Sequence, residues 1–134
     1  MNIEALKEAI NNENNSSIIY TNISEIKKIK NDTLQQIGLN RDNLKDFNKK
    51  LKNYRYIDNI NDLTCGNYIR TINLEKIDKI KLNNNVIICE IDSGENGSLL
   101  KVRTFNNNYF ILYFEKNLIF QKITDQETLI LKAI

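Results

Sequence analysis

The absence of histidine sets the first limit on the chemistry that this sequence can support. It removes Ser-His and Cys-His nucleophilic systems and histidine metal sites together. Carboxylates remain as acid–base groups, and Glu90, Asp92 and Glu95 cluster around one predicted strand end and hairpin. Glu90 and Asp92 would share a strand face, where such a pair can hold a divalent cation or act in hydrolysis. Solvated residues at a turn are the simpler interpretation, so we predict no enzyme activity, no catalytic residue, no metal site and no cofactor.

A basic stretch is the second feature that could bind a ligand. Residues 27–55 carry nine basic and three acidic side chains, so this segment has a net charge of +6 while the rest of the chain has −4. Four of the basic residues recur at helical steps, namely Arg41, Lys45, Lys49 and Lys52. Such a stripe can neutralise phosphates, and Tyr54 and Tyr56 flank Arg55, where they could stack on bases. The alternative is the solvated face of an ordinary helix.

The most apolar run of the chain is Tyr-Phe-Ile-Leu-Tyr-Phe, at residues 109–114. In a strand, successive side chains point to opposite faces, so the even-numbered residues lie on one face and the odd-numbered residues on the other. One face is expected to be core. The other is either covered by helices or forms a hydrophobic surface for a partner. We expect it to be covered, because a barrel with docked helices buries both sides of a central strand.

Helices are expected to position the basic stretch. Asn22, with Glu25 three residues later, resembles a capping box, and Gly38 is placed to end the helix that follows. Asn40 is a plausible cap for the next helix. Its buried face is marked at i, i+3, i+7 and i+10 by Leu44, Phe47, Leu51 and Tyr54. Near the end of the chain, residues 124–127 form a Thr-x-x-Glu capping box, which predicts a short C-terminal helix.

The second half of the chain changes to strand patterns. Five segments have strand length and composition, at residues 66–73, 86–91, 98–105, 109–114 and 118–123. Short Gly- and Asn-rich connectors indicate an antiparallel meander, and five short strands tend to curl. We therefore predict an α+β fold with N-terminal helices (region 1–53). They are followed in region 54–134 by a five-stranded antiparallel, SH3-like or partly open small β-barrel and a short C-terminal helix. The two regions are expected to pack as one domain.

Composition bounds the class of protein further. The 134 residues, with 41% hydrophobic and 27% charged side chains, fit one globular domain. The 23 Asn, 22 Ile and 15 Lys residues indicate an AT-rich genome. Two cysteines, Cys65 and Cys89, are too few for a secreted disulfide framework and are expected to be free and buried. We recognise neither a signal peptide nor an apolar run of membrane length, so we expect an intracellular, cytoplasmic protein without membrane contact.

Three short motifs carry a resemblance to a known group of proteins. They are Tyr54-Arg55-Tyr56-Ile57-Asp58, Gly66-Asn67-Tyr68-Ile69-Arg70, and a Phe-Gln-Lys segment that leads into Thr-x-Gln-Glu within residues 119–127. Over residues 54–134 the chain resembles small uncharacterised proteins of nucleocytoplasmic large DNA viruses (giant viruses). The resemblance implies a viral origin, with the host cytoplasm or the virion as location, and no particular activity. Arg55 and Arg70 offer planar forks for carboxylate, phosphate or carbonyl groups, and clamping the helices to the barrel is the alternative role.

These features favour a binding module over an enzyme. The first hypothesis is a non-enzymatic interaction or scaffolding module that acts through protein–protein contacts. The second is a nucleic-acid-binding accessory protein that uses the basic helix at residues 40–55, and the third is a carboxylate-dependent hydrolase. The candidate residues for binding nucleic acid or a partner are Lys45, Lys49, Lys52, Tyr54, Arg55, Tyr68, Arg70 and Arg103.

Overall fold

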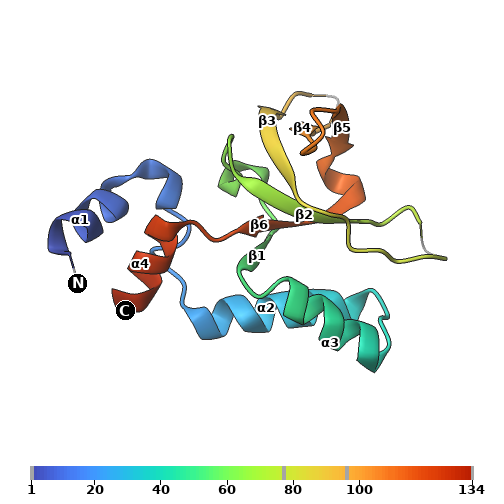
Figure 1. Cartoon of the computed structure of the whole chain (residues 1–134), viewed down its shortest axis with the longest axis horizontal. Coiled ribbons are helices and arrows are strands. Elements are labelled where there is room, and N and C mark those ends of the chain that lie inside the picture. The colour runs from blue at the N-terminus through green and yellow to red at the C-terminus, as the bar shows by residue number, and fades with distance from the viewer. Residues whose placement is uncertain (1, 77, 96, 134) are drawn as a thin grey trace.

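The computed structural model describes residues 2–76, 78–95 and 97–133, and Met1, Ile77, Asn96 and Ile134 lie outside these ranges. The described residues form an α+β fold with four α-helices, three single-turn 3-10 helices and six strands (Figure 1). The α-helices are α1 (Ile3–Asn11), α2 (Ile23–Gln36), α3 (Arg41–Lys50) and α4 (Asp125–Ala133). The strands are β1 (Tyr54–Ile57), β2 (Tyr68–Asn73), β3 (Val86–Asp92), β4 (Leu99–Arg103), β5 (Tyr109–Tyr113) and β6 (Asn117–Lys122). The 3-10 helices are η1 (Glu13–Asn15), η2 (Ile60–Asp62) and η3 (Phe114–Lys116).

The predicted helix caps are confirmed. Asn22 and Asn40 each accept a hydrogen bond from the backbone N–H three residues later, at 2.8 Å in both cases. Gly38 follows α2 with a φ of 76°, a left-handed conformation that glycine adopts without strain. At the start of α4, the backbone N–H groups of Thr124 and Glu127 donate to each other's side chains at 3.0 and 3.1 Å. This reciprocal pair is a complete capping box.

The six strands form one antiparallel sheet in the order β1-β6-β2-β3-β4-β5. The five predicted strands are present as β2 to β6, but the count of five is wrong because β1 pairs with β6. Tyr54, assigned by its spacing to the third helix, is the first residue of β1. Helix α3 ends at Lys50, and the Lys30 ammonium donates to the carbonyls of Leu51 and Tyr54 at 2.7 and 3.0 Å where the chain turns into the strand.

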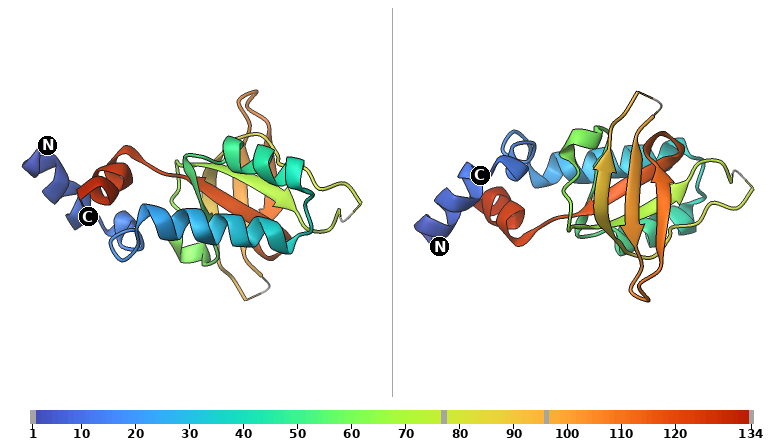
Figure 2. Two further views of the ribbon diagram at one scale, coloured as in Figure 1. Left: turned by 90° about the horizontal axis from the view of Figure 1, so that it is seen from below. Right: turned by 90° about the horizontal axis from the view of Figure 1, so that it is seen from above.

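The sheet bends between β2 and β3, so that its two halves cross and face one another (Figure 2). In the described register, Tyr68 and Ile69 pair with β3, whereas Ile69 and the residues after it in β2 pair with β6. Apolar residues of both halves pack inside the bend, namely Ile57, Ile69, Val86, Ile88, Leu100, Val102 and Ile119, together with Leu63. Helices α2 and α3 cover the opposite face of β1, β6 and β2 through Leu34, Phe47 and Leu51, which pack on Tyr54, Ile72, Leu118 and Phe120.

Helices α1 and α4 pack beside each other at one end of the molecule, where both termini lie (Figure 1). Their small core consists of Ala9, Ile18, Ile26, Ile130 and Leu131. The contact joins the predicted region 1–53 to the predicted region 54–134, and the division between the two stays a prediction. In the described part of the chain, no helix combines the length and the apolar character that a membrane span requires.

Candidate functional site

Strand β5 forms one edge of the sheet and, among the described residues, pairs with β4 alone. It carries no charged side chain, and four of its five residues are exposed: Tyr109 (59%), Phe110 (41%), Ile111 (48%) and Tyr113 (48%). Both faces of the strand are therefore accessible. The expectation that helices cover the second face is wrong, because α2 and α3 pack over β1, β6 and β2 instead. An open, apolar edge strand of this kind is a template for pairing with another chain.

The hydrogen bonds at the ends of β5 show which backbone groups face the open edge. The N–H of Thr104 donates to the carbonyl of Asn108 at 2.9 Å, and the N–H of Phe114 donates to the carbonyl of Ser98 at 3.0 Å. Both bonds continue the β4–β5 register. Bonded and non-bonded pairs alternate along an antiparallel ladder. The even-numbered residues of β5 therefore bond to β4, and the odd-numbered residues point their N–H and C=O groups away from it.

The outward-pointing backbone groups belong to Tyr109, Ile111 and Tyr113. The side-chain amide of Asn117 donates to the Tyr113 carbonyl at 2.9 Å, which agrees with this assignment. Within the described ranges, the N–H and C=O groups of Tyr109 and Ile111 have no such partner. An extended segment placed along β5 would supply the missing hydrogen bonds.

A groove of about 540 Å³ borders the inner face of β5. Phe110, Leu112 and Val86 contribute apolar side chains to it. The polar lining is dominated by asparagines, namely Asn73, Asn83, Asn84, Asn85, Asn106, Asn108 and Asn117. Each amide side chain both donates and accepts hydrogen bonds. The groove therefore suits polar, hydrogen-bonding groups. The outer face of the same strand presents aromatic and aliphatic side chains, and the Lys101 and Lys116 ammonium groups lie over the rings of Tyr109 and Tyr113 at 5.3 and 4.9 Å from the centroids.

Two of the sequence-predicted residues, Tyr68 and Arg103, come together on the outer face of the sheet. They line a small cavity of about 80 Å³ together with Phe105. The Tyr68 ring stacks on Phe105 with 6.1 Å between the ring centroids, and the Lys122 ammonium lies 5.8 Å from the centroid of Tyr68. Arg103 donates from Nη1 to the side chain of Asn107 at 3.0 Å. Aromatic and cationic groups thus lie side by side on the outer face of the sheet.

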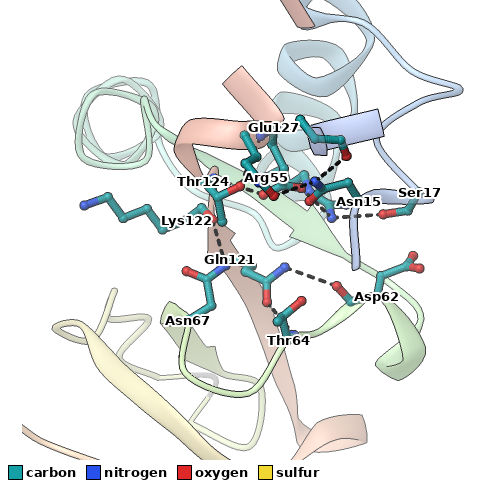
Figure 3. A network of polar contacts seen from close by, with 12 residues as sticks. Asn15, Ser17, Arg55, Asp62, Thr64, Asn67, Gln121, Lys122, Thr124 and Glu127 are labelled. Atoms are coloured by element: carbon teal, nitrogen blue, oxygen red, sulfur yellow. Dashed lines mark hydrogen bonds and ion pairs between the residues drawn. The ribbon is translucent and has the colours of Figure 1, made fainter. Parts of the chain in front are cut away.

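Arg55 is buried at the junction of β1 and α4 (Figure 3). Its Nη2 donates to Ser17 Oγ at 3.0 Å and lies 3.1 Å from Oε2 of Glu127, which is itself buried. In the part of the chain described here, Arg55 Nε and Glu127 Oε2 have no hydrogen-bond partner. The attraction between the two opposite charges therefore offsets the cost of burying these atoms. Arg55 therefore clamps α4 and the Ser17 segment to β1. This is the alternative role expected for it, and it removes Arg55 from the candidate binding surface.

Gln121 extends the buried polar network on β6 (Figure 3). Its Oε1 accepts a hydrogen bond from the N–H of Thr64 at 2.9 Å, and its Nε2 donates to the carbonyl of Asp62 at 3.1 Å. Gln121 also lies opposite Arg55 in β1 and Ile69 in β2. The motifs that contain Arg55, Arg70 and Gln121 thus lie on the neighbouring strands β1, β2 and β6, where these polar residues make contacts within the fold.

The remaining predicted residues of β1 and β2 also make internal contacts. Tyr54 is buried, and its hydroxyl donates to the side chain of Asn85. Arg70 donates from Nε to the carbonyl of Asn83 at 2.9 Å. Both residues tie their strands to the loop before β3, and burial removes Tyr54 as a base-stacking residue. Burial, and to a lesser degree the nearby Asp58, raises the pKa of the neighbouring Tyr56.

The stripe lysines behave differently, because Lys45, Lys49 and Lys52 are all exposed on or just after α3. None of the ion pairs formed by the described residues includes them. On the same helix, Lys50 lies 3.0 Å from Asp46. The stripe is therefore available for an anionic partner.

The carboxylates considered for catalysis are exposed on the outer face of β3. Glu90 Oε1 lies 4.0 Å from the Lys101 ammonium, and neither Glu90 nor Asp92 lines the cavities beside β5. Across residues 2–76, 78–95 and 97–133, no group of three or more His, Cys, Asp or Glu side chains could hold a metal ion. Both cysteines are free, but Cys65 is exposed, which corrects the expectation that both are buried.

The open edge of β5 and the asparagine groove are not evident from the sequence patterns alone. The apolar run 109–114 is visible in the sequence, but its exposure depends on the order of strands in the sheet. The asparagine runs Asn83–Asn85 and Asn106–Asn108 indicate turns in the sequence. That they line one groove follows only from the bend of the sheet. The run 109–113 carries no charged residue, whereas the neighbouring strands do. This lack of charge is the sequence signal that could have predicted an interface at β5.

No known protein family matches the chain, and comparisons with curated proteins and with solved structures find no similar protein. The resemblance to giant-virus proteins therefore rests on the three sequence motifs.

Proposed function

We propose that this protein is a non-enzymatic interaction module that accepts an extended strand of a partner protein along β5. The observation that carries the proposal is the open edge itself. Strand β5 is uncharged and exposed on both faces, and the backbone groups of Tyr109 and Ile111 point outward. In strand addition, main-chain hydrogen bonds give affinity, and the sites for alternate side chains give specificity.

The two faces of β5 define the chemistry of the partner strand. Side chains of an added strand alternate between the faces. Those that point inward enter the asparagine-lined groove beside Phe110 and Leu112 and are polar, such as Ser, Thr, Asn or Gln. Those that point outward lie beside Tyr109, Ile111 and Tyr113 and are apolar. A second copy of β5 fits this groove less well, because its own Phe and Leu side chains would point at the amides.

We also propose that the bent sheet is an SH3-like, partly open small barrel. Support comes from the order of the strands, in which β2 to β5 form a meander and β6 returns beside β2 after the single turn η3. The asparagine groove, bounded by β5 and by Asn117 of β6, is then the opening of the barrel. A strand added to β5 would lie along this opening.

Proline substitution tests the proposed function at single-residue resolution. The N–H of Ile111 points away from β4, so Ile111→Pro should remove an outward donor and leave the ladder in place. Leu112→Pro is the matched control, because it removes an N–H that bonds to β4 and should destabilise the fold. The probe is a displayed library of random dodecapeptides, selected on the wild type alone, and the affinity of each selected peptide is then measured for both the wild type and I111P. We expect binders with alternating polar and apolar residues that slow amide hydrogen exchange at Tyr109 and Ile111.

Three outcomes would contradict this function. Peptides that bind I111P as tightly as the wild type would exclude strand pairing at this edge. Peptides that protect amides far from β5 would place the binding site elsewhere. A wild-type dimer that I111P dissociates would identify a second copy of the chain as the occupant, in place of a partner protein.

Nucleic-acid binding through α3 is a second candidate, favoured by the exposed and unpaired lysines Lys45, Lys49 and Lys52. Tyr54 and Arg55 do not contribute, because both are buried. Titration of labelled single- and double-stranded DNA and RNA at two salt concentrations tests it. Binding that weakens steeply with salt, and further in Lys45→Glu/Lys49→Glu, supports this function, and no binding at low salt removes it.

A further inference from the structure

A cavity between α2 and α3 gathers lysines far from strand β5. It has a volume of about 280 Å³ and is lined by Lys27, Lys30, Asn31, Asn48 and Lys52. The side-chain amide of Asn48 donates to Oδ1 of Asn31 at 2.9 Å across the two helices. The polar wall of the cavity is therefore fixed by an interhelical hydrogen bond. We call this cavity the lysine pocket.

Lys30 is the buried member of the lysine pocket, with 4% of its surface exposed. Its ammonium donates to the carbonyls of Leu51 and Tyr54, at 2.7 and 3.0 Å. An ammonium has three N–H donors, so one of them has no acceptor among the described residues. Neither acceptor carries a charge, and the ion pairs of the described residues include no pocket lysine.

A buried cation without a carboxylate partner is electrostatically unfavourable. Burial, and then the repulsion from Lys27, lowers the pKa of Lys30. Lys27 and Lys52 add two exposed positive charges at the mouth of the same cavity. An anion in the cavity would accept the remaining N–H of Lys30 and lie beside all three positive charges.

We infer that the lysine pocket binds a phosphate group. Three ammonium groups beside two amide side chains match a multiply charged oxyanion with several acceptor oxygens better than a single carboxylate. The cavity of about 280 Å³ has room for a phosphate and several waters, each of which occupies roughly 30 Å³ in the liquid. The phosphate is either free, as an inorganic ion or a small phosphorylated molecule, or part of a polynucleotide backbone. In the second case, Lys49 and Lys45 would meet neighbouring phosphates along α3.

The test is a titration with inorganic phosphate, compared with chloride at equal ionic strength and followed by NMR of the side-chain amides of Asn31 and Asn48. We expect saturable shifts of these amides with phosphate alone. The double variant Lys27→Gln/Lys52→Gln changes two exposed residues, so the fold should be kept. It should lower the affinity for phosphate about tenfold or more. Lys28→Gln/Lys50→Gln is the control, because it removes the same charge from exposed positions of the same helices outside the pocket.

Equal shifts with chloride, or an equal loss of affinity in the two double variants, would overturn the inference, since binding would then reflect diffuse charge. A single-stranded oligothymidylate distinguishes the sources. Oligonucleotide binding that falls in K27Q/K52Q and falls further when Lys45→Gln/Lys49→Gln is added identifies backbone phosphate. Phosphate binding without oligonucleotide binding identifies a free phosphate ligand. The lysine pocket and β5 lie on different elements, so either proposal can fail while the other stands.

Discussion

Replacing Glu127 by glutamine should lower the free energy of unfolding by about 3 kcal/mol, because it leaves the Arg55 charge buried without a counter-charge. In the wild type, Arg55 Nη2 lies 3.1 Å from Glu127 Oε2, and both side chains are less than one-tenth exposed. At an effective dielectric constant of about 20, Coulomb's law gives an attraction of about 5 kcal/mol, which offsets the desolvation of both groups. Glutamine retains an Oε1 acceptor for the Thr124 N–H, so the capping box should survive the change.

Urea denaturation followed by circular dichroism measures this effect in a double-mutant cycle. We expect Glu127→Gln and Arg55→Met to cost about 3 kcal/mol each, and the double variant to cost about 2 kcal/mol less than their sum, because it removes both charges. Thr124→Ala is the control, since it removes the acceptor of the Glu127 N–H and leaves the ion pair, at a cost of about 1 kcal/mol. The clamp between Arg55 and Glu127 would be refuted if the costs of the two single variants simply added in the double variant. It would also be refuted if E127Q were no more destabilising than T124A.

Three further predictions concern single residues. The pKa of Lys30 in the folded state is lowered from its ordinary value of 10.5. Just below pH 10.5 the unfolded state therefore binds more protons than the folded state. The stability of the wild type relative to Lys30→Met should rise with pH in that window. Urea midpoints of both proteins, measured from about pH 8 upward, check this, and a difference that falls with pH would contradict it. Gly38→Ala should cost about 1 kcal/mol in thermal denaturation, because a φ of 76° strains a side chain. Phe120→Ala should cost about 3–5 kcal/mol by urea denaturation, whereas Tyr20→Ala, at a residue 92% exposed, should change stability by less than about 0.5 kcal/mol.

The helix ends could be predicted because their causes are local. Asn22 and Asn40 cap helices through bonds that span three residues, and the Thr124–Glu127 pair does the same. Strand β1 could not be found in this way. Tyr54 continues the helical spacing of α3, and its strand conformation depends on pairing with β6, which follows much later in the chain.

The candidate residues divide by burial, and burial depends on distant partners. Arg55 looks like a surface arginine in the sequence, yet Glu127 and Ser17 meet it in the interior. Lys30 lies in the same basic stretch as the exposed stripe but faces two backbone carbonyls. In contrast, Tyr68 and Arg103 do line one surface cavity, because the β2–β3–β4 order brings them together.

The exposure of β5 follows from where β6 inserts. In a simple meander, β6 would pair with β5 and bury the apolar run between two neighbours. Instead β6 lies between β1 and β2, so among the described strands β5 has only one neighbour. Helices α2 and α3 pack on the half of the sheet that contains β6 and leave β5 uncovered. Local composition at Tyr109–Tyr113 therefore has the character of a core strand, while the topology leaves it at the surface. Because natural sheets usually protect their edges with charge, proline or cover, this mismatch favours an added partner strand over a solvent-exposed edge.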